Sequence, residues 1–265
     1  MDTNTGITRP YEYYNVAIYC LLSCLFFHIL ENIPTEYVLL SFLPKRIRER
    51  INEELKKKEE IKPKNLRIRG IAFIHAIISS LLGLYTLLLP TVRDNPYSST
   101  PSSWIYIGTF SLGYFLWDII IILRQWGQNN DSSVWLFHGI VSFVALFNSY
   151  IIQEQCLIGI LASGMVTELS TILLSIKYCY YNAGDNESRS CKVISYLFVL
   201  TFFLTRNVLL LYQMNIELYR AYQLAPSYRS KVYIWFFFPV GELFNLLNIY
   251  WLIKIINVTK RSKEE

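Results

Sequence analysis

Seven ionisable side chains interrupt the long apolar stretches of this sequence. They are three histidines, three acids and one arginine: His28, His75, Asp118, His138, Glu168, Arg206 and Glu242. A charged group at the centre of a membrane helix costs at least about 2.5–3.5 kcal/mol on insertion scales, so such groups normally face a bundle interior and find partners there. An imidazole or carboxylate held there can also serve as a general base towards a bound substrate.

Helical spacing gives most of these groups polar neighbours, because residues three or four apart share one helix face. The predicted faces are His75, Ser79 and Gly83; His138, Ser142 and Ser149; Gly164, Glu168, Thr171 and Ser175; and Glu242, Asn245 and Asn248. Two interpretations stay open for these faces, a structural network that holds helices together and a ligand site. His28 lies near the end of its stretch and fits an interfacial histidine. Because an unpaired guanidinium is costly in hydrocarbon, we expect Arg206 to pair with Glu168 or Asp118.

The elements that must position these groups are seven apolar stretches, each long enough to cross about 30 Å of hydrocarbon as a helix of about 20 residues. We predict an all-α polytopic membrane bundle, because helices satisfy their own backbone hydrogen bonds in lipid. The stretches are Tyr14–Glu31, Gly70–Pro90, Trp104–Leu123, Val134–Ile152, Cys156–Ile176, Val193–Gln213 and Val232–Ile256. Pro34 is expected to kink or end the first helix, which Val38–Leu43 would continue.

Composition excludes several other classes of protein. Hydrophobic residues make up 53% of the chain and aromatic residues 16%, and no loop is long enough for a soluble domain. The five cysteines include no C-x2-C pair, so no metal site is expected. Nucleotide-binding glycine loops and hydrolase motifs do not occur either, so we expect no cofactor. Membrane lipids are the expected partners, nucleic acid is not, and the sequence leaves the oligomeric state open.

Charge predicts the orientation and the domain limits. Residues 45–69 carry 11 Lys and Arg against 5 Asp and Glu, and the positive-inside rule places that loop in the cytosol. With seven spans, 19 Lys and Arg then fall on the cytosolic side and five on the other. We therefore predict a lumenal N-terminus with the first helix (1–44), a basic cytosolic loop (45–69), a six-helix domain (70–257) and a cytosolic tail (258–265).

Several segments together resemble the TLC-domain family, the membrane domain of ceramide synthases and their relatives. The resemblance covers about residues 67–257. It rests on HAIISSLLGLYTLLL (75–89), GYFLWDIIIIL (113–123), FHGIVSF (137–143), TELST (167–171), FFLTRNVLL (202–210) and NIYWLIKI (248–255). In ceramide synthases a His-His pair and a later Asp-x-x-Asp are thought to act in acyl transfer. Here Phe137 precedes His138, and Glu168 is the one carboxylate of the later segment.

The resemblance implies six TLC-type helices preceded by one further helix, and a function in lipid handling. We expect an endomembrane protein, of the endoplasmic reticulum or a related membrane, that binds acyl chains and contributes to lipid homeostasis. One alternative is an acyl-CoA-dependent sphingoid N-acyltransferase, in which acyl-CoA is a substrate, His138 is the base and Asp118 or Glu168 orients it. The other alternative is a seven-helix receptor or transporter.

The orientation is tested by three acceptor sequences for N-glycosylation. They begin at Asn130, Asn186 and Asn257, and all lie on the predicted cytosolic side. We expect none to carry a glycan in the full-length protein, whereas a sequon in a tag ahead of Met1 should be glycosylated. Endoglycosidase-sensitive mass at any native sequon would invert the orientation.

Overall fold

The computed structural model describes residues 13–57, 61–94, 101–127, 132–151, 157–225 and 227–261. Within these ranges every regular element is helical, and seven helical stretches are long and apolar enough to cross a membrane. The stretches are Tyr13–Leu30, Asn65–Leu88, Trp104–Arg124, Ser132–Tyr150, Ile158–Asn182, Arg189–Leu224 and Ser230–Ile256. The all-α, seven-span prediction is confirmed. Residues 1–12 and 262–265, which belong to the predicted lumenal end and cytosolic tail, lie outside the described part of the chain.

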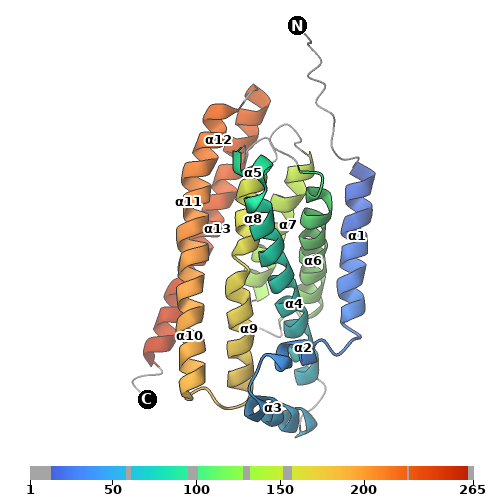
Figure 1. Cartoon of the computed structure of the whole chain (residues 1–265), viewed down its shortest axis with the longest axis vertical. Coiled ribbons are helices and arrows are strands. Elements are labelled where there is room, and N and C mark those ends of the chain that lie inside the picture. The colour runs from blue at the N-terminus through green and yellow to red at the C-terminus, as the bar shows by residue number, and fades with distance from the viewer. Residues whose placement is uncertain are drawn as a thin grey trace.

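The helices run alternately up and down the long axis of the molecule (Figure 1). In chain order the elements are α1 (Tyr13–Leu30), α2 (Glu36–Ser41), α3 (Lys45–Lys57), α4 (Ile61–Leu88), α5 (Pro90–Asp94), α6 (Trp104–Arg124), α7 (Ser132–Ile151), α8 (Ile158–Val166), α9 (Leu169–Asn182), α10 (Arg189–Phe202), η1 (Phe203–Leu209), α11 (Leu210–Tyr212), η2 (Gln213–Glu217), α12 (Leu218–Leu224) and α13 (Tyr228–Arg261). The short helix α3, the turn after α9 and the C-terminal end of α13 lie at one end of the bundle (Figure 1). We call this the basic end, because α3 belongs to the basic loop.

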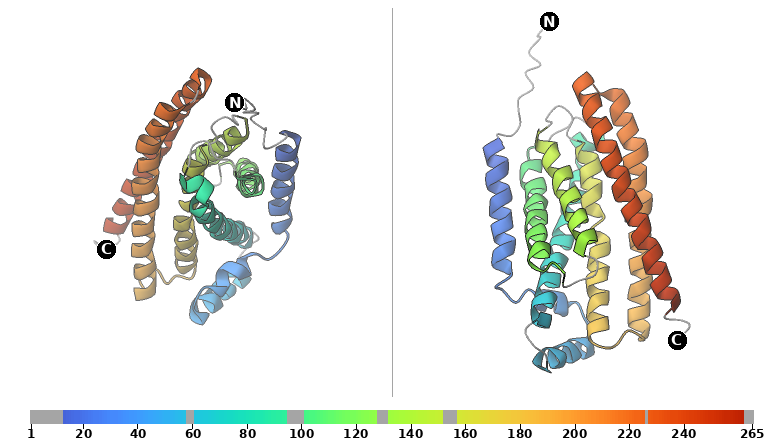
Figure 2. Two further views of the ribbon diagram at one scale, coloured as in Figure 1. Left: turned by 45° about the horizontal axis from the view of Figure 1, so that its top comes forward. Right: turned by 180° about the vertical axis from the view of Figure 1, so that it is seen from behind.

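Helix α1 lies at the periphery and packs mainly on α6, as both views of Figure 2 show. The close approach depends on Gly113, where an added Cβ would come within 2.6 Å of the Cys20 carbonyl oxygen. At its C-terminal end Glu31 accepts a hydrogen bond from the Trp117 indole at 2.6 Å. The chain then turns before Pro34, and α2 packs against α4 instead of extending α1. The expected continuation through Val38–Leu43 is therefore wrong, because these residues bury Leu39, Leu40 and Leu43 against the bundle.

Two spans depart from the continuous helices that the sequence predicts. The fifth span divides into α8 and α9 at a turn formed by Thr167 and Glu168. The sixth is 36 residues long and includes two π-helical segments, η1 and η2. Wide π-helical turns often mark functional positions, because they shift the direction of the side chains that follow. Glu168 lies at the first irregularity and Arg206 lies in η1, so these breaks position the buried charges.

The first part of the basic loop folds as α3, an amphipathic helix docked on the basic end, whereas its last part, from Ile61, belongs to α4. Ile47 and Ile51, four residues apart, are buried in a cluster with Tyr180 and Cys191. Two arginines of α3 share one acceptor. Arg50 donates to an Asp185 carboxylate oxygen at 2.8 Å, and Arg46 donates to the same oxygen at 3.2 Å. Asp185 stands in the turn between α9 and α10, so one carboxylate connects α3 to two spans.

Removing that carboxylate should loosen α3. We expect Asp185→Ala to lower the free energy of unfolding by about 1 kcal/mol, because both arginines are substantially solvated. Trypsin should also cut the Lys- and Arg-rich α3 faster in the variant. Glu187→Ala is the matched control, since Glu187 is an exposed acid in the same turn. Equal cleavage rates in the two variants would show that Asp185 does not hold α3.

Candidate functional site

A cavity of about 480 Å³ lies inside the bundle, between α4, α6, α7, α9, α10, η1 and α13. Four of the residues singled out from the sequence line it: Asp118, His138, Glu168 and Arg206. Its lining extends to the basic end, where Arg69, Lys177 and Lys254 contribute three cationic side chains. The remaining wall is largely apolar and aromatic, with residues such as Leu174 and Phe202. The cavity thus combines a cationic end, a polar middle and apolar walls.

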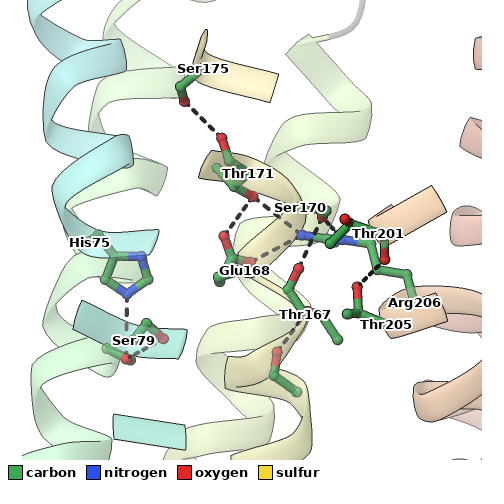
Figure 3. Close-up of polar contacts among 12 residues, drawn as sticks. His75, Ser79, Thr167, Glu168, Ser170, Thr171, Ser175, Thr201, Thr205 and Arg206 are labelled. Carbon is green, nitrogen blue, oxygen red and sulfur yellow. Dashed lines mark hydrogen bonds and ion pairs between the residues drawn. The ribbon is translucent and has the colours of Figure 1, made fainter. Parts of the chain in front are cut away.

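The central feature of the cavity is a buried ion pair. Arg206 Nη2 lies 3.2 Å from Glu168 Oε1, and the side chains are 5% and 10% exposed. Arg206 Nε also donates to Ser170 Oγ at 3.0 Å, and Thr171 Oγ1 donates to Glu168 Oε2 at 2.8 Å (Figure 3). The expected partner of Arg206 is therefore Glu168, not Asp118. Two neighbouring hydroxyls satisfy further polar atoms of the pair, as a buried ion pair requires.

His138 stands beside this pair in an aromatic cage. Its ring centroid lies 5.2 Å from that of Phe244, 5.7 Å from Trp251 and 6.0 Å from Phe115. Its Nδ1 is buried and has no hydrogen-bond partner among the described residues. An imidazole held by ring contacts alone keeps its hydrogen-bonding capacity for a ligand.

Asp118 lines the same cavity from α6. Within the described residues no side chain donates a hydrogen bond to its carboxylate, whereas Arg69 and Glu168 both interact with it electrostatically. One carboxylate oxygen lies 3.7 Å from the position of a Cβ on Gly139, the residue after His138. Asp118 and His138 therefore face one cavity from adjacent antiparallel helices, as the short connection between their spans predicts.

The other singled-out residues lie outside the cavity. His75 is fully buried behind it, stacked on Tyr114 at 3.6 Å, and shares a hydrogen bond of 3.3 Å with Ser111. Glu242 is half-buried and accepts from Asn245 at 3.3 Å on its own helix. His28 is exposed and pairs with Glu31 at 2.9 Å, which agrees with an interfacial histidine.

The sequence reasoning missed the three cations of the cavity. Arg69, Lys177 and Lys254 stand near the ends of α4, α9 and α13, where positive charge is also expected from topology alone. Their contribution to one cavity depends on how these three helices meet. The one available signal was their position at the span ends, since Arg69 and Lys177 directly flank predicted spans and Lys254 lies two residues inside one.

A helical bundle whose apolar spans enclose a polar, charge-lined cavity defines a multi-pass membrane protein with an internal cavity. The chain belongs to the TLC domain family, whose TRAM, LAG1 and CLN8 model matches residues 65–257. The match begins at the first residue of the second span, so α1 to α3 precede it. No curated protein matches the chain.

The ion pair should dominate stability. Arg206→Met leaves the Glu168 carboxylate buried without its cation, and breaking one side of such a pair costs roughly 3–5 kcal/mol. We expect a severalfold loss of folded protein, measured by size-exclusion fluorescence in mild detergent. Arg206→Met combined with Glu168→Gln should recover part of the yield. Full yield of the single variant would show that the pair does not hold the spans together.

Proposed function

We propose that this protein binds an amphipathic lipid in the cavity, with its polar group among the charged residues. The observation that carries the proposal is the order of the lining, cationic at the basic end and apolar in the walls. Membership of the TLC domain family, a family of membrane lipid-related proteins, supports it. The cavity of about 480 Å³ is within the range of ligand sites, roughly 300–1,000 Å³.

The cations favour a ligand with an acidic headgroup. Arg69 and Lys177 come from different spans, and Lys254 adds a third charge from α13. Cations near the headgroup level each contribute about 1 kcal/mol towards anionic lipid. Deeper in the cavity His138 and Asp118 offer hydrogen-bonding groups that the protein leaves largely unused, so a second polar group of the ligand fits there.

The setting of this function is also proposed. We infer a protein of the endoplasmic reticulum or a related endomembrane with a lumenal N-terminus, a cytosolic C-terminus and a role in membrane lipid homeostasis. The 19-to-5 distribution of Lys and Arg supports this orientation. The segments that carry the family resemblance support placement in the branch that includes TLC domain-containing protein 4, also called transmembrane protein 56.

One observation favours acyl transfer as a second candidate, namely His138 beside Glu168 in the cavity. In that reaction a sphingoid amine would attack the acyl-CoA thioester carbon and lose a proton to His138, and the CoA thiol would leave with a proton. Phe137, at the position of the family's other histidine, is 38% exposed and is not among the residues that line the cavity. A histidine at Phe137 would therefore add no second imidazole to the cavity.

Copurification of the protein with lipid tests the proposed lipid binding against acyl transfer. The protein is purified in mild detergent with an equimolar mixture of phosphatidic acid and phosphatidylcholine, and bound lipid is quantified by mass spectrometry. We expect phosphatidic acid to dominate, and Lys177→Gln with Lys254→Gln to reduce its retention about fivefold per charge removed. Arg93→Gln, an exposed cation on α5 at the other end of the bundle, is the control.

Equal retention of both lipids by all variants would contradict the proposal. The same preparation is then incubated with acyl-CoA and a sphingoid base. N-acylation by the unmodified protein that His138→Ala abolishes would establish the second candidate and show that binding alone is an incomplete account.

A further inference from the structure

A second, smaller chamber adjoins the cavity on the side away from the basic end. Its volume is about 80 Å³, and its walls come mainly from α7, α8 and α13, with Leu210 and Met214 of the sixth span. Helix α8 lies above α9 in Figure 1, so the chamber continues the cavity towards the opposite end of the bundle. Most of its lining is apolar, and it includes Leu146, Ile160, Leu161 and Phe237.

Three residues line both spaces and so mark the boundary between them, where a passage would run. They are Phe115, His138 and Glu168. The polar groups of the site therefore stand where the charged cavity changes into an apolar chamber. A ligand that crosses this passage must be polar on one side and hydrocarbon on the other.

We propose that the chamber binds the terminal carbons of the lipid's hydrocarbon tail and that Gly164 sets the tail length the protein accepts. The inference rests on the lipid binding proposed above. The headgroup then lies at the basic end, the polar part of the ligand meets His138 at the passage, and the tail ends between α8 and α13. The chamber, at about 80 Å³, is far smaller than the cavity of about 480 Å³, which matches a chain end and not a whole chain.

Which hydrocarbon tail binds in the chamber must depend on how well its length fits the chamber, and not on the hydrophobic effect. A tail that enters the chamber leaves a bilayer that is equally apolar, so little free energy comes from burial itself. A chain too long for the chamber overpacks its walls, and a chain too short leaves a void without dispersion contacts. Either mismatch weakens binding, so the chamber selects lipids by the length of their tails.

Gly164 is the residue of the chamber whose identity packing does not explain. A Cβ at Gly164 would meet no atom within 4 Å, and its backbone is ordinary α-helix. At Gly241, which also lines the chamber, a Cβ would come within 2.7 Å of Met214 Sδ. A Cβ at 241 would thus have to move the Met214 side chain, whereas a Cβ at 164 would move nothing. Since glycine is unfavourable inside a helix relative to alanine, the empty space beside Gly164 is itself the feature that glycine maintains.

The test measures chain length directly. Unmodified protein and variants are purified in mild detergent with an equimolar series of saturated lysophosphatidic acids that differ in steps of two carbons. Bound lipid is extracted and its chain-length distribution is measured by mass spectrometry. Gly164→Ala adds a Cβ that meets no atom within 4 Å, and Gly164→Leu extends the added side chain further. Both replace glycine with a better helix former, so folding should be preserved.

We expect Gly164→Leu to move the preferred chain roughly four carbons shorter, because leucine adds four carbons to a space of fixed volume. Gly164→Ala should produce a smaller shift in the same direction. Leu161→Ala, which enlarges the chamber, should move the preference to longer chains. Val144→Leu, on the exposed face of α7 and outside both spaces, should leave the distribution unchanged.

The outcomes separate this inference from the lipid-binding proposal. Lipid bound in normal amount with one distribution in all variants would overturn the chain-end site and leave lipid binding intact. Absence of bound lipid from the unmodified protein would overturn both. A shift towards shorter chains in Val144→Leu equal to that in Gly164→Leu would also overturn the assignment, because the effect would then not come from the chamber.

Discussion

A guanidinium inside hydrocarbon has to be paired, and much of the central architecture serves the pair of Arg206 and Glu168. The carboxylate stands where the fifth span breaks into α8 and α9, and the guanidinium stands on the widened turn η1. Ser170 and Thr171, just after the break, provide the additional hydrogen bonds. Both irregularities would cost stability in an ordinary helix. Here each allows a polar group to reach its partner in a region where water cannot substitute for it.

The pair also organises the space around it. Arg206 and Glu168 neutralise each other. His138 and Asp118 are therefore the polar groups of the cavity with the fewest hydrogen bonds to the described part of the protein. On one side of them lies the cationic end of the cavity, and on the other lies the apolar chamber that begins at Phe115, His138 and Glu168. This gradient of polarity across the two adjoining spaces has the same order as the parts of an amphipathic lipid.

Glycines have two opposite structural effects in this bundle: some allow close contact between helices, and one leaves open space. At Gly113 and Gly83 the absence of a Cβ lets α1 approach α6 and α4 approach α8, and an added Cβ at Gly83 would come within 2.7 Å of the Ala162 carbonyl oxygen. These contacts replace the hydrophobic driving force that is missing between helices in lipid. At Gly164 nothing approaches, and the missing side chain leaves an open volume beside the site. On α8 the close contact at Ala162 and the open volume at Gly164 are only two residues apart.

The sequence by itself determined the class of fold and the intramembrane position of the polar groups. Seven apolar runs of membrane length admit no other architecture, and an isolated Arg206 in such a run required a carboxylate. Tertiary structure decided which carboxylate it was, because Glu168 and Asp118 are equally polar in sequence and differ only in where their helices meet. It also separated His138, which lines the cavity, from His75 and Glu242, which do not. The cations at the basic end and the empty space at Gly164 arise from the packing of distant helices, and residue type and spacing do not encode such volumes.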